Sequence, residues 1–297
     1  MNDNACESCN EDLELLGSRT DIATNSETYA ESPRQTVALG IEYDGCNYCG
    51  WQTQPDQPTV QDVLEEALAR FVTKPVATIC AGRTDAGVHA TGQVVSFTVD
   101  CVRPEHAWVR GVNTFLPKDI AVRWARSVPD TFHARFDAAS RTYQYWICND
   151  RVRSPVLEGR TGWVWRPCDE ALMHAEAQCL LGEHDFTSFR AAECQAATPV
   201  RTIEKICVAR FGRLIGIEIT ANAFLQHMVR NIVGSLVYVG IGRERPGWLA
   251  DVLEARERAA AAPTFDPHGL YLVGVRYPTA DVPERGAAPF QIGRAHV

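Results

Sequence analysis

The sequence has no long apolar run. The longest candidate, Ile232 to Ile241, is interrupted by glycine and serine and is far shorter than the roughly 20 residues that span a bilayer. The first residues, MNDNACESCNEDLELL, lack the basic start and apolar stretch of a secretion signal, and they are acidic where an organelle transit peptide is rich in arginine. We therefore expect a cytoplasmic protein that does not span a membrane.

The sequence also lacks the cysteine pattern of a disulfide framework. Its 11 cysteines are an odd number, and several lie in apolar segments, as Cys80, Cys148, Cys179 and Cys207 do. This usage favours free thiols that act as small core residues. The alternative is a zinc site with four thiolate ligands from Cys6-x-x-Cys9 and Cys46-x-x-Cys49. It is disfavoured because the first pair lies in a polar tail.

An excess of positive charge is missing as well, since the net charge is −8. Phosphate neutralisation is the main source of affinity for nucleic acids, so this value argues against an RNA partner. However, residues 1–34 carry eight acids against Arg19 and Arg34, and the remaining chain is close to neutral. Its basic residues are mostly arginine, which suits forked phosphate contacts. Net charge therefore does not decide the question.

The periodicity of apolar residues changes along the chain and predicts an α+β fold. Residues 1–34 are typical of an acidic disordered tail. An N-terminal α+β subdomain is expected over 35–135 and a second over 136–278, while 279–297 form a tail. Each half is expected to hold a mixed, mainly antiparallel sheet, and the two halves to pack with a cleft between them. The last seven residues, QIGRAHV, match a translated sequencing adapter, and we expect the native C-terminus to lie before them.

Individual elements follow from alternation and helical spacing. Thr59 is expected to cap a helix whose apolar residues recur from Val60 to Phe71. Further helices are expected after Pro104 and over 170–181, 222–239 and 246–260. Strands are expected over 36–43, 76–80, 93–99, 121–128, 141–148, 201–209, 213–220 and 270–277, with a polar turn over 82–90.

The turn GRTDAGVHA places Asp85 between two strands, with Arg83 two residues before it. A carboxylate beside an arginine, flanked by Gly82 and Gly87, is arranged to stay ionised and act as a nucleophile or base. A turn aspartate that caps its own backbone is the commoner role of an isolated Asp-Ala-Gly. Asp85 alone therefore leaves both interpretations open.

Three other features are candidates for the same site. Arg230 falls on a different helical face from the apolar stripe of residues 225–236, although a solvated surface arginine would look the same. Tyr143 begins a strand and could present its phenol to a base, or it could be a packing residue. The segment FHARF interleaves aromatic and basic side chains, as stacking and phosphate contacts require: Phe132, His133, Ala134, Arg135 and Phe136.

Eight ordered blocks of the sequence together resemble the bacterial TruA family of tRNA pseudouridine synthases, from about Val37 to Pro278. They are EYDGCNYCGWQ, TVQDVLEEAL, AGRTDAGVHATGQVVSF, GVNTFLPKDIAVRWA, FHARFDAASRTYQYWI, LLGEHDFTSFRA, NAFLQHMVRNIVGSL and GLYLVGVRYP. The lone RTDAG string would be only suggestive, whereas eight blocks in order are specific.

The resemblance implies that Asp85 is the catalytic aspartate, Tyr143 the active-site tyrosine and Arg230 the arginine that pairs with the aspartate. It implies that Arg83 helps to flip the target base and that FHARF contacts tRNA. The implied enzyme is an isomerase with the pseudouridine synthase fold, in which two similar halves are joined around a central positively charged cleft. It acts as a homodimer on uridines 38, 39 and 40 of the tRNA anticodon arm. It needs no metal or other cofactor. Attack on the sugar, attack on the uracil ring and a glycal route remain open for Asp85.

Two other functions must be weighed against this one. A metal-dependent hydrolase would use as ligands Asp85, His89, His133, His184 and Asp185. An RNA-binding chaperone would hold tRNA without modifying it. The first predicts loss of activity with chelators, and the second predicts that Asp85→Ala changes nothing measurable.

Overall fold

The computed structural model describes residues 33–287 and 289–290. The predicted acidic tail except for its last two residues, the Cys6-x-x-Cys9 pair and the QIGRAHV terminus lie outside these residues. None of the helices in the described part is long and apolar enough to cross a membrane. The boundary between the two predicted subdomains falls in the connection between the fourth and fifth strands, and it remains a prediction.

A mixed sheet of ten strands forms the centre of the fold, in the order β4-β1-β3-β10-β5-β9-β8-β7, with β2 beside β3 and β6 beside β5. The pairings β10–β3 and β5–β6 are parallel, and the others are antiparallel. This confirms the predicted α+β class. The strands are β1 (Gln35–Tyr43), β2 (Ile79–Cys80), β3 (His89–Val99), β4 (Ile120–Val128), β5 (Ser140–Asn149), β6 (Gly162–Val164), β7 (Gly182–Asp185), β8 (Val200–Phe211), β9 (Leu214–Ala221) and β10 (Leu270–Arg276).

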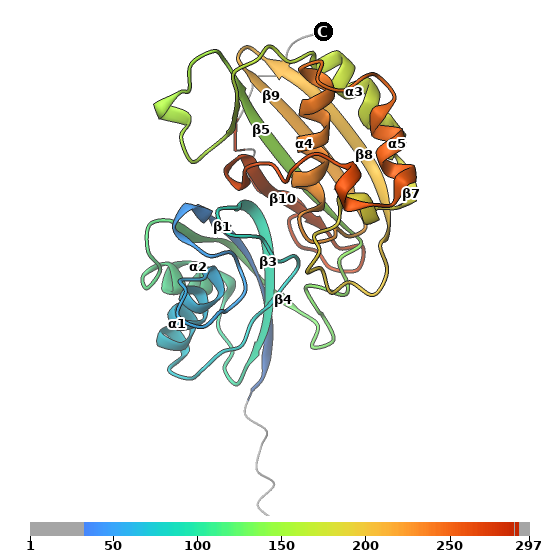
Figure 1. Cartoon of the computed structure of the whole chain (residues 1–297). Coiled ribbons are helices and arrows are strands. Elements are labelled where there is room, and N and C mark those ends of the chain that lie inside the picture. The colour runs from blue at the N-terminus through green and yellow to red at the C-terminus, as the bar shows by residue number, and fades with distance from the viewer. Residues whose placement is uncertain (1–32, 288, 291–297) are drawn as a thin grey trace, which may run out of the picture. The chain divides into compact units, whose positions relative to one another are not determined.

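The last strand, β10, joins the strands of the two halves into one sheet (Figure 1). On one side it pairs in parallel with the start of β3, where Tyr271 lies opposite His89. On the other side it pairs with β5, where Leu272 lies opposite Tyr143. The loop that precedes β3 and the Tyr143 side of β5 are therefore brought near each other by a strand far from both in sequence.

Five α-helices in the described part of the chain cover the sheet: α1 (Val60–Val72), α2 (Glu105–Asn113), α3 (Glu170–Ala177), α4 (Met228–Gly240) and α5 (Trp248–Ala255). Thr59 caps α1 by accepting a hydrogen bond from the Asp62 N–H, as predicted, and the apolar face of α1 is buried at Val60, Leu64 and Leu68. In Figure 1, α1 and α2 lie with the N-terminal strands, and α3, α4 and α5 lie over β8 and β9.

The predicted helix over 222–239 begins later than expected, at Met228. The residue before it, His227, has a left-handed φ of 62°, which an α-helix does not accommodate. Arg230 consequently lies in the first turn of α4 and not in its middle. Asn231 is fully buried and donates to the Phe189 carbonyl.

Several other elements begin or end elsewhere than the periodicity suggested. The strand predicted over 76–80 is reduced to Ile79–Cys80, and β3 already begins at His89. The third and fifth helices end at Ala177 and Ala255, each followed by a short 3-10 turn. Apolar spacing alone does not distinguish a continuing α-helix from a 3-10 turn, because both bury one face.

Candidate active site

The loop that carries Asp85, residues 81–88, connects β2 to β3 and is held at several points. The Gln93 side chain donates from Nε2 to the Gly82 carbonyl at 2.6 Å. The Thr84 carbonyl accepts a hydrogen bond of 3.0 Å from the Trp51 N–H, and the Thr84 hydroxyl lies 2.8 Å from the Tyr43 hydroxyl. Tyr43, Trp51 and Gln93 are almost fully buried. The Asp85 loop is therefore fixed from the core and is not a free surface turn.

A second loop approaches the Asp85 loop so closely that only glycine fits. Gly50 has φ +90°, and a Cβ there would lie 2.6 Å from the Thr84 carbonyl oxygen and 3.1 Å from the Asp85 carbonyl carbon. Gly50 therefore contributes both a left-handed conformation and the space that the Asp85 backbone occupies.

The Asp85 carboxylate faces two side chains from the start of α4. Its Oδ2 lies 3.1 Å from Nη1 of Arg230 and 3.5 Å from Nε2 of His227. Arg230 also donates from Nε to the Phe265 carbonyl at 2.8 Å, which fixes the plane of its guanidinium. The Arg230 side chain is 13% exposed and that of Asp85 is 27% exposed. The predicted Asp85–Arg230 contact is thus present. Both side chains are largely buried, and the exposed part of Asp85 remains accessible to a substrate.

Tyr143 lies on β5 beside this pair and is buried, with 7% of its surface exposed. Its hydroxyl approaches Gly82, and its ring meets that of Phe224 edge-on, with centroids 5.0 Å apart. Burial, and then the negative charge of Asp85, raise the pKa of Tyr143 well above its usual range, although Arg141 opposes this. The phenol is therefore protonated throughout the physiological pH range.

Arg83 is exposed, and within the described residues its side chain makes neither a hydrogen bond nor an ion pair. Burial raises the pKa of the Cys80 thiol to about 11, and the positive charges of Arg83, Arg135 and Arg141 oppose this rise. Three arginines thus lie around the end of β2, and the Asp85 loop begins in a region of positive charge.

The FHARF segment, residues 132–136, divides into a buried and an exposed part. Phe132 and Ala134 are buried: the Phe132 ring packs against Tyr277 at 5.1 Å, and the Ala134 carbonyl accepts from the Tyr277 hydroxyl. Phe136 is 74% exposed and Arg135 is exposed as well. The buried pair anchors the segment, and the exposed pair is free to meet a ligand.

Between them, the His133 ring stacks on Phe136 with a centroid distance of 4.2 Å. Its Nδ1 accepts from the N–H groups of Arg135 and Phe136, each at 3.2 Å. His133 therefore orders the exposed half of the segment.

Sequence reasoning gave no role to several residues that the structure places at the site. They are His227, Gln93, Phe224 and Arg141. The spacing of His227 and Arg230 was a usable signal for the first. Nothing in the local sequence distinguishes the other three from ordinary strand and loop residues.

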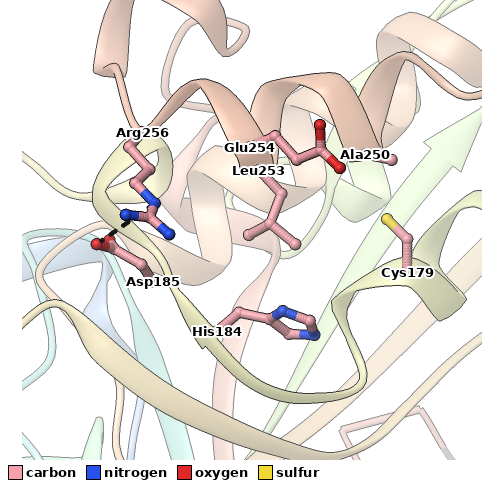
Figure 2. A pocket seen from close by; sticks show the side chains of 7 residues that line it. All are labelled: Cys179, His184, Asp185, Ala250, Leu253, Glu254 and Arg256. Atoms are coloured by element: carbon pink, nitrogen blue, oxygen red, sulfur yellow. Dashed lines mark ion pairs between the residues drawn. The ribbon is translucent and has the colours of Figure 1, made fainter.

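The side chains considered for a metal-dependent hydrolase do not assemble. No three of the five candidate ligands lie together, and the one ligand-type group found among the described residues is Asp44, Cys46 and His89. His184 donates to the Leu181 carbonyl, and Asp185 pairs with Arg256 in an open pocket beside α5 (Figure 2).

The Asp44 group has its own internal partners. Asp44 forms a 2.7 Å ion pair with Arg160. Both His89 nitrogens are engaged, one by the Gly45 N–H and the other by the His268 carbonyl. Cys46 donates to the Gly159 carbonyl and Cys49 to the Gln57 side chain, so the two thiols have separate partners. These contacts give the group a structural role in holding the loop after β1.

Comparison with known proteins identifies the family of this chain. A family profile described as tRNA pseudouridine synthase matches residues 40–137 and 177–278. A protein named tRNA pseudouridine synthase A from Burkholderia cenocepacia is 54% identical over 257 residues, which cover 86% of this chain and 94% of that protein. One from Paraburkholderia phymatum with the same name is 51% identical over 257 residues, covering 86% and 96%.

A chain of a solved Cbf5–Nop10–Gar1 complex is a remote structural neighbour: the alignment covers 79% of this chain and 57% of that chain, at 9% identity and a TM-score of 0.33. The family is shown by the profile match and by the identity to relatives that are covered over 94% and 96% of their length. The chain belongs to the tRNA pseudouridine synthase family, whose members are isomerases acting on uridine in tRNA.

Proposed function

We propose that this enzyme converts uridine to pseudouridine at positions 38, 39 and 40 of the tRNA anticodon arm, with Asp85 as the nucleophile. The observation that carries the proposal is the contact between the Asp85 carboxylate and Arg230, at 3.1 Å, in a chain of this family. The guanidinium orients one carboxylate oxygen and leaves the other for the substrate.

The target uridine must leave the base stack before its glycosidic bond can be reached, which costs a few kcal/mol. Arg83 is exposed and has no protein partner in the described structure, so it can take the space that the base vacates. Asp85 then attacks the substrate as nucleophile, and the bond that its carboxylate forms breaks again before the product leaves, which regenerates the carboxylate. The bond from uracil N1 to the sugar C1′ breaks, and a bond from C5 to C1′ forms after the base turns. A proton leaves C5 and one is gained at N1, so the product is an isomer of the substrate.

Tyr143 is proposed to stack on the flipped base and to act as a hydrogen-bond donor. Its raised pKa means that the phenol carries its proton at neutral pH, so it can donate to the uracil and cannot begin the reaction as a phenolate base. Nε2 of His227 lies 3.5 Å from the same Asp85 oxygen, so the imidazole is a second group that can accept or donate a proton at this site. No cofactor enters this scheme.

For tRNA binding, we propose that the exposed Arg135 and Phe136 contact the RNA, with His133 supporting them and Phe132 and Ala134 anchoring the segment. Stacking of a base on Phe136 and a phosphate contact from Arg135 are the interactions that such side chains offer.

We further propose a homodimer in the cytoplasm, with each tRNA held across both subunits. Supporting this, the connection between β5 and β6 and the residue after β6 expose apolar side chains that a second copy could cover: Val152 is 72%, Val156 86% and Trp165 57% exposed. All nine cysteines for which a state is described are free thiols, as in a reducing compartment. Light scattering tests the dimer, and a particle with the mass of one chain at micromolar concentration would contradict it.

Tritium release from tRNA labelled at uracil C5 tests the reaction directly. We expect release by wild type and by Asp100→Asn, an exposed surface control paired with Lys74, and none by Asp85→Asn, all with a chelator present. Substrates that keep uridine at only one of the three positions test the site of reaction. Release by Asp85→Asn would contradict the nucleophile, and release only from other uridines would contradict the position. Wild type that binds tRNA without release would favour a binding protein.

A further inference from the structure

The guanidinium of Arg141, at the start of β5, is hydrogen-bonded to four backbone carbonyls. Nε and Nη2 donate to the Ala81 carbonyl at 3.2 and 3.0 Å, and Nη2 also donates to the Arg135 carbonyl at 2.5 Å. Nη1 donates to the carbonyls of Ala138 and Asn222 at 2.8 and 2.9 Å. One side chain thus contacts the chain at points as far apart in sequence as 81 and 222.

Each of these carbonyls belongs to a segment that carries a proposed site residue. Ala81 begins the loop that holds Arg83 and Asp85. Arg135 lies in the FHARF segment, and Ala138 follows it closely. Asn222 begins the irregular connection from β9 to α4, which ends at His227. The Asp85 loop and the β9–α4 connection also meet through His227 and Asp85, at 3.5 Å, and Arg141 is the side chain that bonds to all three segments.

Arg141 itself stands on a rigid base. Its backbone pairs with Val275 of β10 on one side and Ala221 of β9 on the other, so it lies inside the sheet and not at an edge. Its side chain forms no ion pair within the described residues. Burial lowers the pKa of the guanidinium, and the nearest charged or ionisable groups that act on it are Tyr277, Tyr143, Arg135 and Cys80.

The choice of carbonyl partners distinguishes this arginine from an ordinary structural ion pair. A guanidinium is planar and offers five N–H donors in fixed directions, so it can hold several carbonyls at once. A lysine ammonium is a single point with a flexible stem and cannot reach the same set. Because carbonyls do not neutralise it, Arg141 also keeps a positive charge close to Tyr143 and Cys80.

We propose that Arg141 is a positioning residue for the isomerisation: it aligns the Asp85 loop, the FHARF segment and the entry to α4. This inference rests on the proposed function. Arg141 is expected to act on the reaction step through geometry and not on tRNA affinity, because its donors are already used by the protein. A misplacement of about 1 Å in such a site can lower a rate by roughly 100-fold.

The test compares Arg141→Lys and Arg141→Ala with Arg276→Ala. Arg276 is a matched control, since it is an arginine of the neighbouring strand that bonds Ser140 and pairs with exposed Glu204. We expect kcat of Arg141→Lys to fall by about 100-fold with KM for tRNA little changed. Guanidinium ion at non-denaturing concentration should restore part of the kcat of Arg141→Ala, and urea at equal concentration should not. Arg276→Ala should keep wild-type kinetics.

Hydrogen exchange supplies a readout that does not need activity. In Arg141→Ala, amides of residues 81–88, 132–139 and 222–227 should exchange faster, while those of α1 and central β5 should not. Unchanged exchange in the three segments overturns the proposal, as does a rise in KM alone or a uniform loss of protection without guanidinium rescue. If wild type itself releases no tritium, the proposed function fails, and the exchange result still decides whether Arg141 positions the segments.

Discussion

Nη1 of Arg230 lies 3.1 Å from Oδ2 of Asp85, although 145 residues separate the two in the sequence. The same guanidinium is held by the Phe265 carbonyl through Nε, so Arg230 meets the carboxylate in one fixed orientation. A lysine at this position can satisfy either the carbonyl or the carboxylate, but not both.

We therefore expect Arg230→Lys and Arg230→Gln both to lower kcat, by on the order of 100-fold, which is the usual effect of removing one preorganised donor. Single-turnover rates measured on saturating tRNA report the reaction step. Arg243→Ala is the control, because Arg243 lies just beyond α4 and stacks on Tyr238, away from Asp85. A wild-type rate for Arg230→Lys would show that charge alone suffices and that the fixed orientation of the guanidinium does not matter.

Gly50→Ala tests the contact between the two loops. Both Gly50 and Gly212 have positive φ, so an alanine at either position is strained by roughly 1–2 kcal/mol. At Gly212 nothing lies within 4 Å of the new Cβ, whereas at Gly50 it would lie 2.6 Å from the Thr84 carbonyl oxygen. We expect both variants to unfold at lower urea concentration, but only Gly50→Ala to lose kcat. Equal activity of the two variants would mean that the Asp85 loop moves without consequence.

Local patterns predicted most of the secondary structure, for identifiable reasons. The helix after Thr59 has a cap, an apolar face and no competing signal, and it forms where expected. The helix before Gly240 was predicted to start too early, because residues 222–227 have helical spacing but end at His227 with a left-handed φ. That conformation accompanies the tertiary contact of His227 with Asp85, which no window of local sequence contains.

In the candidate site, too, local sequence revealed some residues, and tertiary contacts were needed to find the others. The Asp85 turn was visible as a motif, and the resemblance to a family supplied Tyr143 and Arg230 as its partners. The roles of Gln93 and Arg141 depend on which carbonyls fold against them, and these are set by the order of strands in the sheet. Within FHARF, burial of Phe132 but not Phe136 depends on Tyr277, a residue after the final strand.

The two phenylalanines of FHARF should therefore respond differently to truncation. Phe132→Ala removes a buried ring that packs on Tyr277 and should lower the free energy of unfolding by about 3 kcal/mol or more. Phe136→Ala should leave stability almost unchanged and raise KM for tRNA about tenfold, as loss of one base stack does. Urea unfolding and steady-state kinetics separate the two effects. Phe211→Ala, on the β8–β9 turn, is the control for loss of a partly exposed ring. An unchanged KM in Phe136→Ala would remove this residue from the tRNA contact.

Buried phenols should make the folded protein sensitive to alkaline pH. Burial is the largest cause of a raised pKa at each of six tyrosines, namely Tyr43, Tyr48, Tyr143, Tyr145, Tyr271 and Tyr277. Because the folded-state pKa lies above the unfolded value of about 10, their contribution to stability is complete below pH 10 and is lost as pH rises toward the folded-state pKa. Each such group contributes at most about 1.4 kcal/mol per pH unit to this loss. Urea unfolding between pH 8 and 11 should show the decline, and Tyr271→Phe should make it less steep. Ultraviolet titration of the folded protein measures the ionisation of these phenols directly. Ionisation near pH 10 would contradict the prediction, because burial would then not protect them.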